Sequence, residues 1–215
     1  MFDRIVALAG LIVLSPFLVT TAVAVKLTSK GSVFFMQERI GKGGVPFRIV
    51  KFRTMTVAPE NTAGMQVTVS GNTRITGVGA ILRRFKLDEI PHLINVLRGQ
   101  MRLVGPRPEV AKYVEFYTEQ QLHALDVAPG MTDLATLYYR NEAEELATQD
   151  DPEAYYIETV LPRKLALNLT YLEKRNFIMD LVIIKLTALV SVLPGGFSNW
   201  VREQIRKRYL DGDSA

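Results

Sequence analysis

The longest uncharged, mostly apolar stretch of this chain runs from residue 5 to residue 25. It carries no charge, is flanked by charged residues on both sides, and is interrupted near its middle by Ser15-Pro16. A bilayer core takes about 20 apolar helical residues. Proline lacks an N–H and clashes with the carbonyl four residues earlier, here Ile12. The pattern therefore predicts an apolar helix that is broken at its centre.

Three structures fit this broken helix: a kinked transmembrane span, a re-entrant helix, and a signal peptide or buried core helix. Its length alone favours a span, and the Ser15 hydroxyl can satisfy a carbonyl that the proline frees. The central break leaves arms of roughly 15 Å, about half the hydrocarbon thickness, which suits a helix that enters one leaflet and returns. Ala22-Val23-Ala24 resembles a cleavage site, but the leading segment has almost no net positive charge.

After this stretch, residues 31–56 predict a β-hairpin. An apolar run at 33–35 and an alternating run at 47–52 flank the turn cluster at 41–44. Arg39, Lys42 and Lys51 are either ordinary hairpin surface charges or part of a site. Residues 57–80, rich in Thr, Gly and Asn, predict a loop that could serve as a lid.

Apolar residues then recur at helical spacing from residue 87 to residue 97. We expect a short helix over 79–86 and a second over 88–97, with Pro91 tolerated in its first turn. Asp88 and Glu89 would then lie at a helix N-terminus, where backbone N–H groups face an incoming phosphate. Consecutive helical residues point about 100° apart, so the two carboxylates would have different roles.

The second half of the chain predicts further helices. Residues 104–109 form a proline-fixed extended segment around Arg107, residues 109–126 and 152–177 predict helices, and 129–132 predicts a turn. The apolar segment 177–193 carries Asp180 and Lys185, which disfavour a second span and leave an amphipathic membrane-surface helix or a core helix. The basic, aromatic segment 198–210 predicts either a headgroup-level helix or a solvated tail.

The acidic pair Asp88-Glu89 lies inside a cationic frame. A carboxylate that attacks or binds a metal, surrounded by cations that hold an anionic substrate, suits chemistry on a phosphate. Taken alone, the same pair could only complement a helix dipole. The frame consists of Arg83, Arg84 and Lys86 before the pair, and Arg98, Arg102 and Arg107 after it.

Composition narrows the class of protein. The 215 residues fit one domain, and a net charge of +4 without a basic-aromatic or zinc pattern does not indicate a nucleic-acid binder. The chain has no Cys, which excludes disulfides and thiolate metal sites, and only two His, which we expect to be structural.

The ordered set of motifs resembles the small monotopic phosphoglycosyl transferases, bacterial sugar transferases that begin surface glycan assembly. The resemblance covers roughly residues 1–185. The matching pieces are Ser15-Pro16, Gly31 to Phe35 with Gln37 and Arg39, Lys51 to Met55, Arg74 to Thr76, Leu87 to Pro91, Asn95 to Leu97, and Leu103 to Pro108.

This resemblance implies an α+β, predominantly helical fold with three parts. These are a re-entrant membrane helix over residues 1–30, a catalytic domain over 31–193 that contains the hairpin, and a C-terminal interfacial helix over 194–215. It also implies a location on the cytoplasmic face of the bacterial inner membrane. The re-entrant helix replaces the span that length alone favours.

The resemblance further implies a two-step transfer. The Asp88 carboxylate would attack the β-phosphate of a UDP-sugar and release UMP, and polyprenol phosphate would then capture the phosphosugar. Mg²⁺ is the implied cofactor, with Asp88 as its ligand. Glu89 would activate or orient the acceptor, and Ser15-Pro16 would set the depth of the site. Lys51, Arg83 and Arg107 match positions around the phosphates.

Four positions depart from the family pattern: Asn72, Gln100, Arg102 and Asp133. They leave the sugar and the shape of the surrounding loops open. A non-catalytic membrane scaffold that binds nucleotide-sugars or lipid phosphates is the alternative function, and the sequence does not indicate an oligomeric state.

Overall fold

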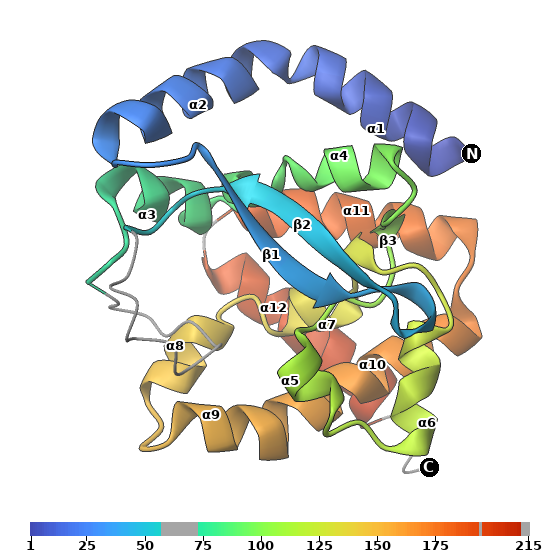
Figure 1. Cartoon of the computed structure of the whole chain (residues 1–215). Helices are drawn as coiled ribbons and strands as arrows, with labels where there is room; N and C mark the ends of the chain where they lie inside the picture. The colour runs from blue at the N-terminus through green and yellow to red at the C-terminus, as the bar shows by residue number, and fades with distance from the viewer. Residues whose placement is uncertain (57–72, 194, 212–215) are drawn as a thin grey trace.

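The computed structural model describes residues 1–56, 73–193 and 195–211. The described chain is mostly helical, with an antiparallel hairpin and a short parallel strand pair, which confirms the expected α+β class. Figure 1 shows two N-terminal helices arching over one side of the molecule, with the hairpin crossing beneath them and further helices on the other side. The predicted lid loop falls mainly on residues outside the described ranges.

The two N-terminal helices, α1 (Phe2–Val13) and α2 (Ser15–Thr28), meet at the expected break. The Ser15 hydroxyl donates a hydrogen bond of 2.7 Å to the carbonyl of Ile12, the partner that Pro16 cannot supply. No single described helix is both long and apolar enough to cross a bilayer; α1 and α2 meet that test only together, across a bend of 64°.

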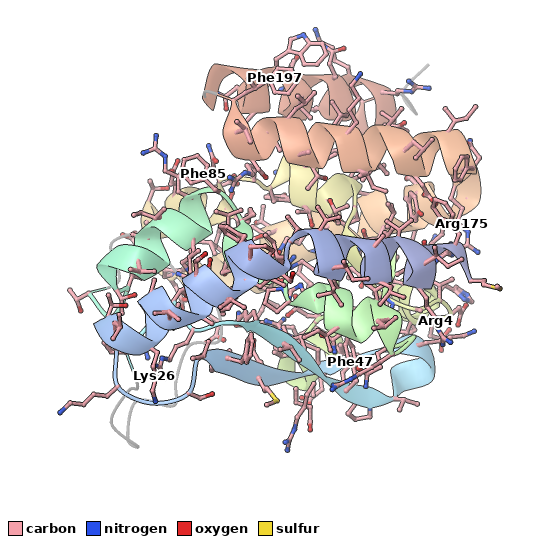
Figure 2. The ribbon with its side chains drawn as sticks, turned by 90° about the horizontal axis from the view of Figure 1, so that it is seen from above. Arg4, Lys26, Phe47, Phe85, Arg175 and Phe197 are labelled. Carbon is pink, nitrogen blue, oxygen red and sulfur yellow. The ribbon has the colours of Figure 1, made fainter. Side chains whose placement is uncertain are left out.

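Both N-terminal helices are packed against the rest of the chain. Figure 2 shows them lying over α3 (Gly77–Arg84) and α4 (His92–Leu97), with the C-terminal helices alongside. Ala7 of α1 is completely buried in one small core, and Val25 of α2 is buried in another. The first core also contains Ile49, Leu93, Val96 and Met101, and the second contains Phe52 and Leu82.

The hairpin pairs β1 (Phe34–Ile40) with β2 (Pro46–Phe52), and a 3₁₀ turn over Lys42–Gly44 connects them. Asn95 of α4 attaches the hairpin to the helical layer. Its buried side-chain oxygen accepts from the Val50 N–H at 3.0 Å, and its amide nitrogen donates to a β2 carbonyl at 2.7 Å. The predicted hairpin is therefore confirmed, and its strand β2 is held against α4.

A parallel strand pair, β3 (Arg102–Val104) and β4 (Gly130–Thr132), joins two segments that are distant in sequence. The turn predicted over 129–132 is therefore wrong. Gly130 lies so close to the backbone of Gly105 that an added Cβ would be 2.2 Å from the Gly105 nitrogen. The glycines allow this approach, and periodicity within either short segment could not indicate the pairing.

The helix predicted over residues 109–126 is also wrong as a single element. It is divided into α5 (Ala111–Val114), α6 (Glu119–Leu122) and a 3₁₀ turn over His123–Leu125. The break arises at Thr118, whose backbone is extended and whose side chain forms a capping box with Gln121. A cap of this kind satisfies orphan N–H groups and starts a new helix.

The remaining helices surround the largest core. The helices expected over 152–177, 177–193 and 198–210 are present, with small changes in their ends. Tyr171, Leu146, Leu167 and Val160 are among the buried side chains of this core. The elements are α7 (Leu134–Tyr138), α8 (Glu142–Ala147), α9 (Pro152–Tyr155), a π-helical turn over Tyr156–Val160, α10 (Leu161–Lys174), α11 (Phe177–Val192), α12 (Gly195–Ile205), and a π-helical turn over Arg206–Leu210.

We expect Gly130→Ala to lower the free energy of unfolding by about 3 kcal/mol, because its methyl group would collide with backbone atoms that have no room to move. Chemical denaturation in detergent would measure the change. Gly77→Ala is the matched control, since its Cβ would meet nothing within 4 Å. Equal stabilities of the two variants would contradict this account of the strand pair.

Candidate active site

The acidic pair lies in a 3₁₀ turn, Leu87–Glu89, between α3 and α4. The prediction of a helix beginning at Asp88 is therefore wrong, because α4 begins only at His92, after Pro91. Lys86, with φ of 56°, adopts the left-handed conformation that commonly ends a helix, here α3. The expected helix N-terminus beside the carboxylates is replaced by this tight turn.

Asp88 is only 6% exposed and lines a cavity of about 960 Å³. Its Oδ1 atom is buried and has no hydrogen-bond partner among the described residues. Burial, followed by the neighbouring Glu89, raises the pKa of Asp88, while Lys86 and Lys51 oppose that shift. Such a carboxylate retains a free lone pair for a metal ion or an electrophile.

Glu89 points to a different partner. Its two oxygens accept from the Arg107 guanidinium, at 3.0 Å from Nη1 and 2.5 Å from Nη2. Burial favours the neutral acid, but the charge of Arg107 and then that of Lys86 outweigh it, so the pKa of Glu89 lies well below its usual value. The two adjacent carboxylates thus have different environments, as consecutive residues of a tight turn allow.

The structure brings all five predicted polar site residues to the same cavity: Lys51 from β2, Arg83 from α3, Asp88 and Glu89 from the turn, and Arg107 from the segment after β3. Burial is the main cause that lowers the pKa of Lys51, to about 8. The helices α1 and α2 together form the N-terminal arch. Ser15-Pro16 lies in this arch and does not line the cavity.

Sequence reasoning missed several charged residues of the cavity wall. Arg39, which could have been an ordinary hairpin charge, pairs with Glu109 at 2.8 Å, whereas Lys42 does not line the cavity. Glu109 also accepts a hydrogen bond from the Tyr156 hydroxyl. These partners are up to 70 residues apart, so no local spacing could indicate them. Arg84 and Lys86 of the predicted cationic frame line the cavity as well, and the cationic residues that were missed are Arg140 and Lys164.

Three of the four positions that depart from the family pattern have definite contacts. Gln100 accepts from the Asn95 side chain at 2.9 Å, and Arg102 donates to Asp3 of α1 at 3.1 Å. Asp133 is completely buried and bonds to backbone N–H groups. Asn72 lies outside the described residues.

The described residues around Asp88 offer few ligands for a magnesium ion. The described residues contain no group of three or more acidic or histidine side chains that could hold a metal. Magnesium, however, is commonly held by one or two carboxylates together with substrate phosphates and water. The free, buried Oδ1 of Asp88 supplies one such oxygen at the cavity wall.

Comparison with known proteins defines the class to which this site belongs. The sequence model of the bacterial sugar transferases matches residues 1–194. This match covers most of the chain, and the chain is therefore a member of the bacterial sugar transferase family.

Named relatives share this region. The chain is 37% identical over 191 residues to a UDP-glucose:undecaprenyl-phosphate glucose-1-phosphate transferase of Xanthomonas campestris pv. campestris, covering 87% of this chain and 37% of that protein. It is 36% identical to a UDP-N-acetylgalactosamine-undecaprenyl-phosphate N-acetylgalactosaminephosphotransferase of Aeromonas hydrophila, covering 73% and 38%. It is 32% identical to the exopolysaccharide production protein ExoY of Rhizobium meliloti (strain 1021), covering 85% and 80%. The chain spans less than two fifths of the first two relatives.

His92 makes a testable contribution to stability. It is 2% exposed, and neither ring nitrogen has a hydrogen-bond partner among the described residues. Burial is the main cause that lowers its pKa to about 4, whereas the pKa of a histidine in the unfolded chain is about 6.5. Between these values the unfolded chain binds a proton that the folded chain excludes, so stability falls as the pH falls.

We expect this histidine to make the protein about 2 kcal/mol less stable at pH 5 than at pH 7. His92→Gln should remove that part of the pH dependence, measured by chemical denaturation in detergent at both pH values. The exposed histidine offers a control, His123→Gln. A His92→Gln variant with an unchanged difference between the two pH values would refute the assignment.

Proposed function

We propose that this chain transfers a sugar-1-phosphate from a UDP-sugar to polyprenol phosphate and releases UMP. The reaction would be the first membrane step of bacterial glycoconjugate assembly, on the cytoplasmic face of the inner membrane. Family membership and the activities for which two relatives are named support the reaction class. Because those relatives carry different sugars in their names, they do not indicate which sugar this chain uses.

The observation that carries the proposal is the buried oxygen of Asp88, which has no hydrogen-bond partner within the described part of the chain and lines a cavity rich in cations. A carboxylate oxygen would form a bond to the β-phosphorus, and the bond from that phosphorus to the bridging oxygen would break as UMP leaves. A phosphate oxygen of the lipid would then attack the same phosphorus and release the carboxylate. Splitting one displacement into two is the ordinary advantage of a covalent nucleophile.

The cations make this attack feasible because an anionic nucleophile must approach an anionic diphosphate. Lys51 and Arg83 line the same cavity as Asp88, and cations placed there would offset the charge repulsion. Asp88 would also hold Mg²⁺ with oxygens of the substrate, and the ion would supply neutralisation of phosphate charge.

Glu89 has a more limited role in this scheme. A carboxylate with a depressed pKa and a bidentate arginine partner is a weak general base. Its contacts support an orienting role instead, in which it fixes the guanidinium of Arg107 beside the cavity. Arginine presents a planar fork that suits phosphate oxygens, so holding this group in place would favour diphosphate binding.

The exposed faces of the helices support a bilayer as a partner. Many apolar side chains of α1 and α2 are exposed. Phe2 of α1 packs edge to face on Phe177 of α11, with ring centroids 5.6 Å apart, so the exposed apolar side chains of α11 lie next to those of α1. An exposed apolar surface of this kind commonly marks a membrane or protein contact. The exposed residues include Ile5, Leu8, Ile12, Val13, Val19, Val23 and Leu27 on the arch, and Ile178, Leu181 and Val182 on α11.

We further propose that the arch enters one leaflet and returns. The arms of 12 and 14 residues are about 20 Å long each at the helical rise, which is shorter than the roughly 30 Å hydrocarbon core. The C-terminal segment after residue 194 stays a predicted interfacial helix.

Asp88→Asn should abolish UMP release from a UDP-sugar, with a loss of at least about a thousand-fold, because an amide cannot act as the nucleophile. Labelled UDP-sugars and polyprenol phosphate would be used, with Asp150→Asn at an exposed position as the control. Without lipid acceptor, intact-mass analysis of the wild type should detect a sugar-phosphate adduct that Asp88→Asn lacks. Undiminished release by this variant would exclude the nucleophile and favour another mechanism.

The topology proposal is tested with new cysteines, since the native chain has none. A cysteine inserted after Met1 and a second at Lys30→Cys should both react only from the cytoplasmic side, because a re-entrant helix keeps both of its ends there. Cells and inverted vesicles treated with an impermeant maleimide would give the answer, with Asp150→Cys as the domain marker. Labelling of the two ends from opposite sides would indicate a full span.

A further inference from the structure

The side chain of Asp133 contacts the backbone of Arg107. Its carboxylate is 0% exposed, and its two oxygens accept hydrogen bonds from different backbone groups. Oδ2 accepts from the N–H of Arg107 at 3.1 Å, and Oδ1 accepts from the N–H of Thr136 at 2.6 Å, which caps α7. One buried side chain therefore connects a short helix to the backbone of a cavity residue 26 positions away.

The parallel pairing of β3 and β4 produces this contact. Val104 lies opposite Thr132, and Gly105 donates from its N–H to the Thr132 carbonyl at 3.1 Å. The chain that leaves β3 consequently passes beside the start of α7, where Asp133 is the N-cap residue. The contact depends on the close approach of two glycine backbones described above, and not on any exposed surface.

Both the backbone and the guanidinium of Arg107 are held by neighbouring residues. Pro106 and Pro108 restrict the backbone on both sides, Asp133 holds the N–H, and Glu89 holds the guanidinium. Glu89 accepts one hydrogen bond from each Nη atom, which leaves the other N–H groups of the guanidinium for a diphosphate. The Asp133 contact involves the backbone alone, so it would persist when a ligand is bound.

We propose that Asp133 is a positioning residue that fixes the backbone of Arg107, so that its guanidinium is preset for a nucleoside diphosphate. This inference rests on the proposed function, since it assigns Arg107 to the phosphates of the donor. Asp133 lines the cavity but would act through Arg107. Its loss should weaken diphosphate binding by leaving the guanidinium incorrectly placed.

The test compares Asp133→Asn with the wild type by the affinity for UDP in the presence of Mg²⁺. Asparagine has one oxygen in place of two, so either the Arg107 N–H or the Thr136 N–H loses its acceptor. The loss of a hydrogen bond to a charged group corresponds to about a tenfold or greater weakening. Calorimetry with UDP titrated to millimolar concentrations would keep weak variants measurable.

Asp151→Asn is a matched control for this substitution. Asp151 also caps a short helix, but a single oxygen, Oδ1, accepts both of its hydrogen bonds. Asparagine keeps such an oxygen, and Asp151 does not line the cavity, so UDP affinity should be unchanged. Asp133→Ser is the second variant, because serine still caps a helix while it withdraws the acceptor from Arg107. Thermal unfolding of each variant would show that the compared proteins are folded.

A double-mutant cycle with Arg107→Ala identifies the route of the effect. Asp133→Ser, which withdraws the acceptor from Arg107 itself, should weaken UDP binding about tenfold in the wild-type background and less than about twofold in the Arg107→Ala background. An equal loss in both backgrounds, or no loss in folded variants, would overturn the inference while the proposed function stands. A wild-type protein that does not bind UDP would overturn the proposed function, and this inference with it.

Discussion

The ion pair between Glu89 and Arg107 connects the two segments that form the candidate site. One segment is the 3₁₀ turn that carries Asp88, and the other is the proline-bounded stretch after β3. Loss of this partner from the partly buried Glu89 carboxylate would be costly, because uncompensated charge is poorly solvated inside a protein. The pair therefore fixes the acidic turn to the segment that carries Arg107, whereas the neighbouring Asp88 has no ion pair with any described residue.

The surrounding architecture supports this arrangement from two sides. Asn95 holds the hairpin against α4, so that Lys51 of β2 reaches the same cavity as the turn. The β3–β4 pair places Arg107 beside the start of α7. Short elements with few local hydrogen bonds can be held in definite positions when side chains that are distant in sequence connect them. The candidate site depends on several such contacts.

Much of the fold could be predicted from the chain alone where local signals were strong. The broken N-terminal helix, the hairpin, and the long helices of the C-terminal half follow from hydrophobic periodicity and turn residues. The Ser15 hydroxyl satisfies Ile12, as the missing N–H of Pro16 suggested. The helix predicted over 109–126 failed because Thr118 and Gln121 form a capping box inside an otherwise helical pattern.

The residues of the candidate site could be predicted from the sequence only in part. The five residues that line the cavity as expected match positions of the family that the sequence resembles, so their grouping could be anticipated. The places of Arg140 and Asp133 could not be, because each depends on a contact with a distant segment. The parallel strands of three residues each were missed for the same reason: pairing across 28 positions leaves no periodic signal in either strand.

The packing of the N-terminal arch has a practical consequence. Ala7 and Val25 are interior residues, and Asp3 is ion-paired with Arg102, so the arch is an integral part of the fold and more than an attached anchor. A truncated version made for crystallisation, beginning after Ala24, would expose Leu93, Val96 and their neighbours to water and would be prone to aggregate. Solubilisation would instead have to keep the arch and replace only its outward-facing side chains with polar ones.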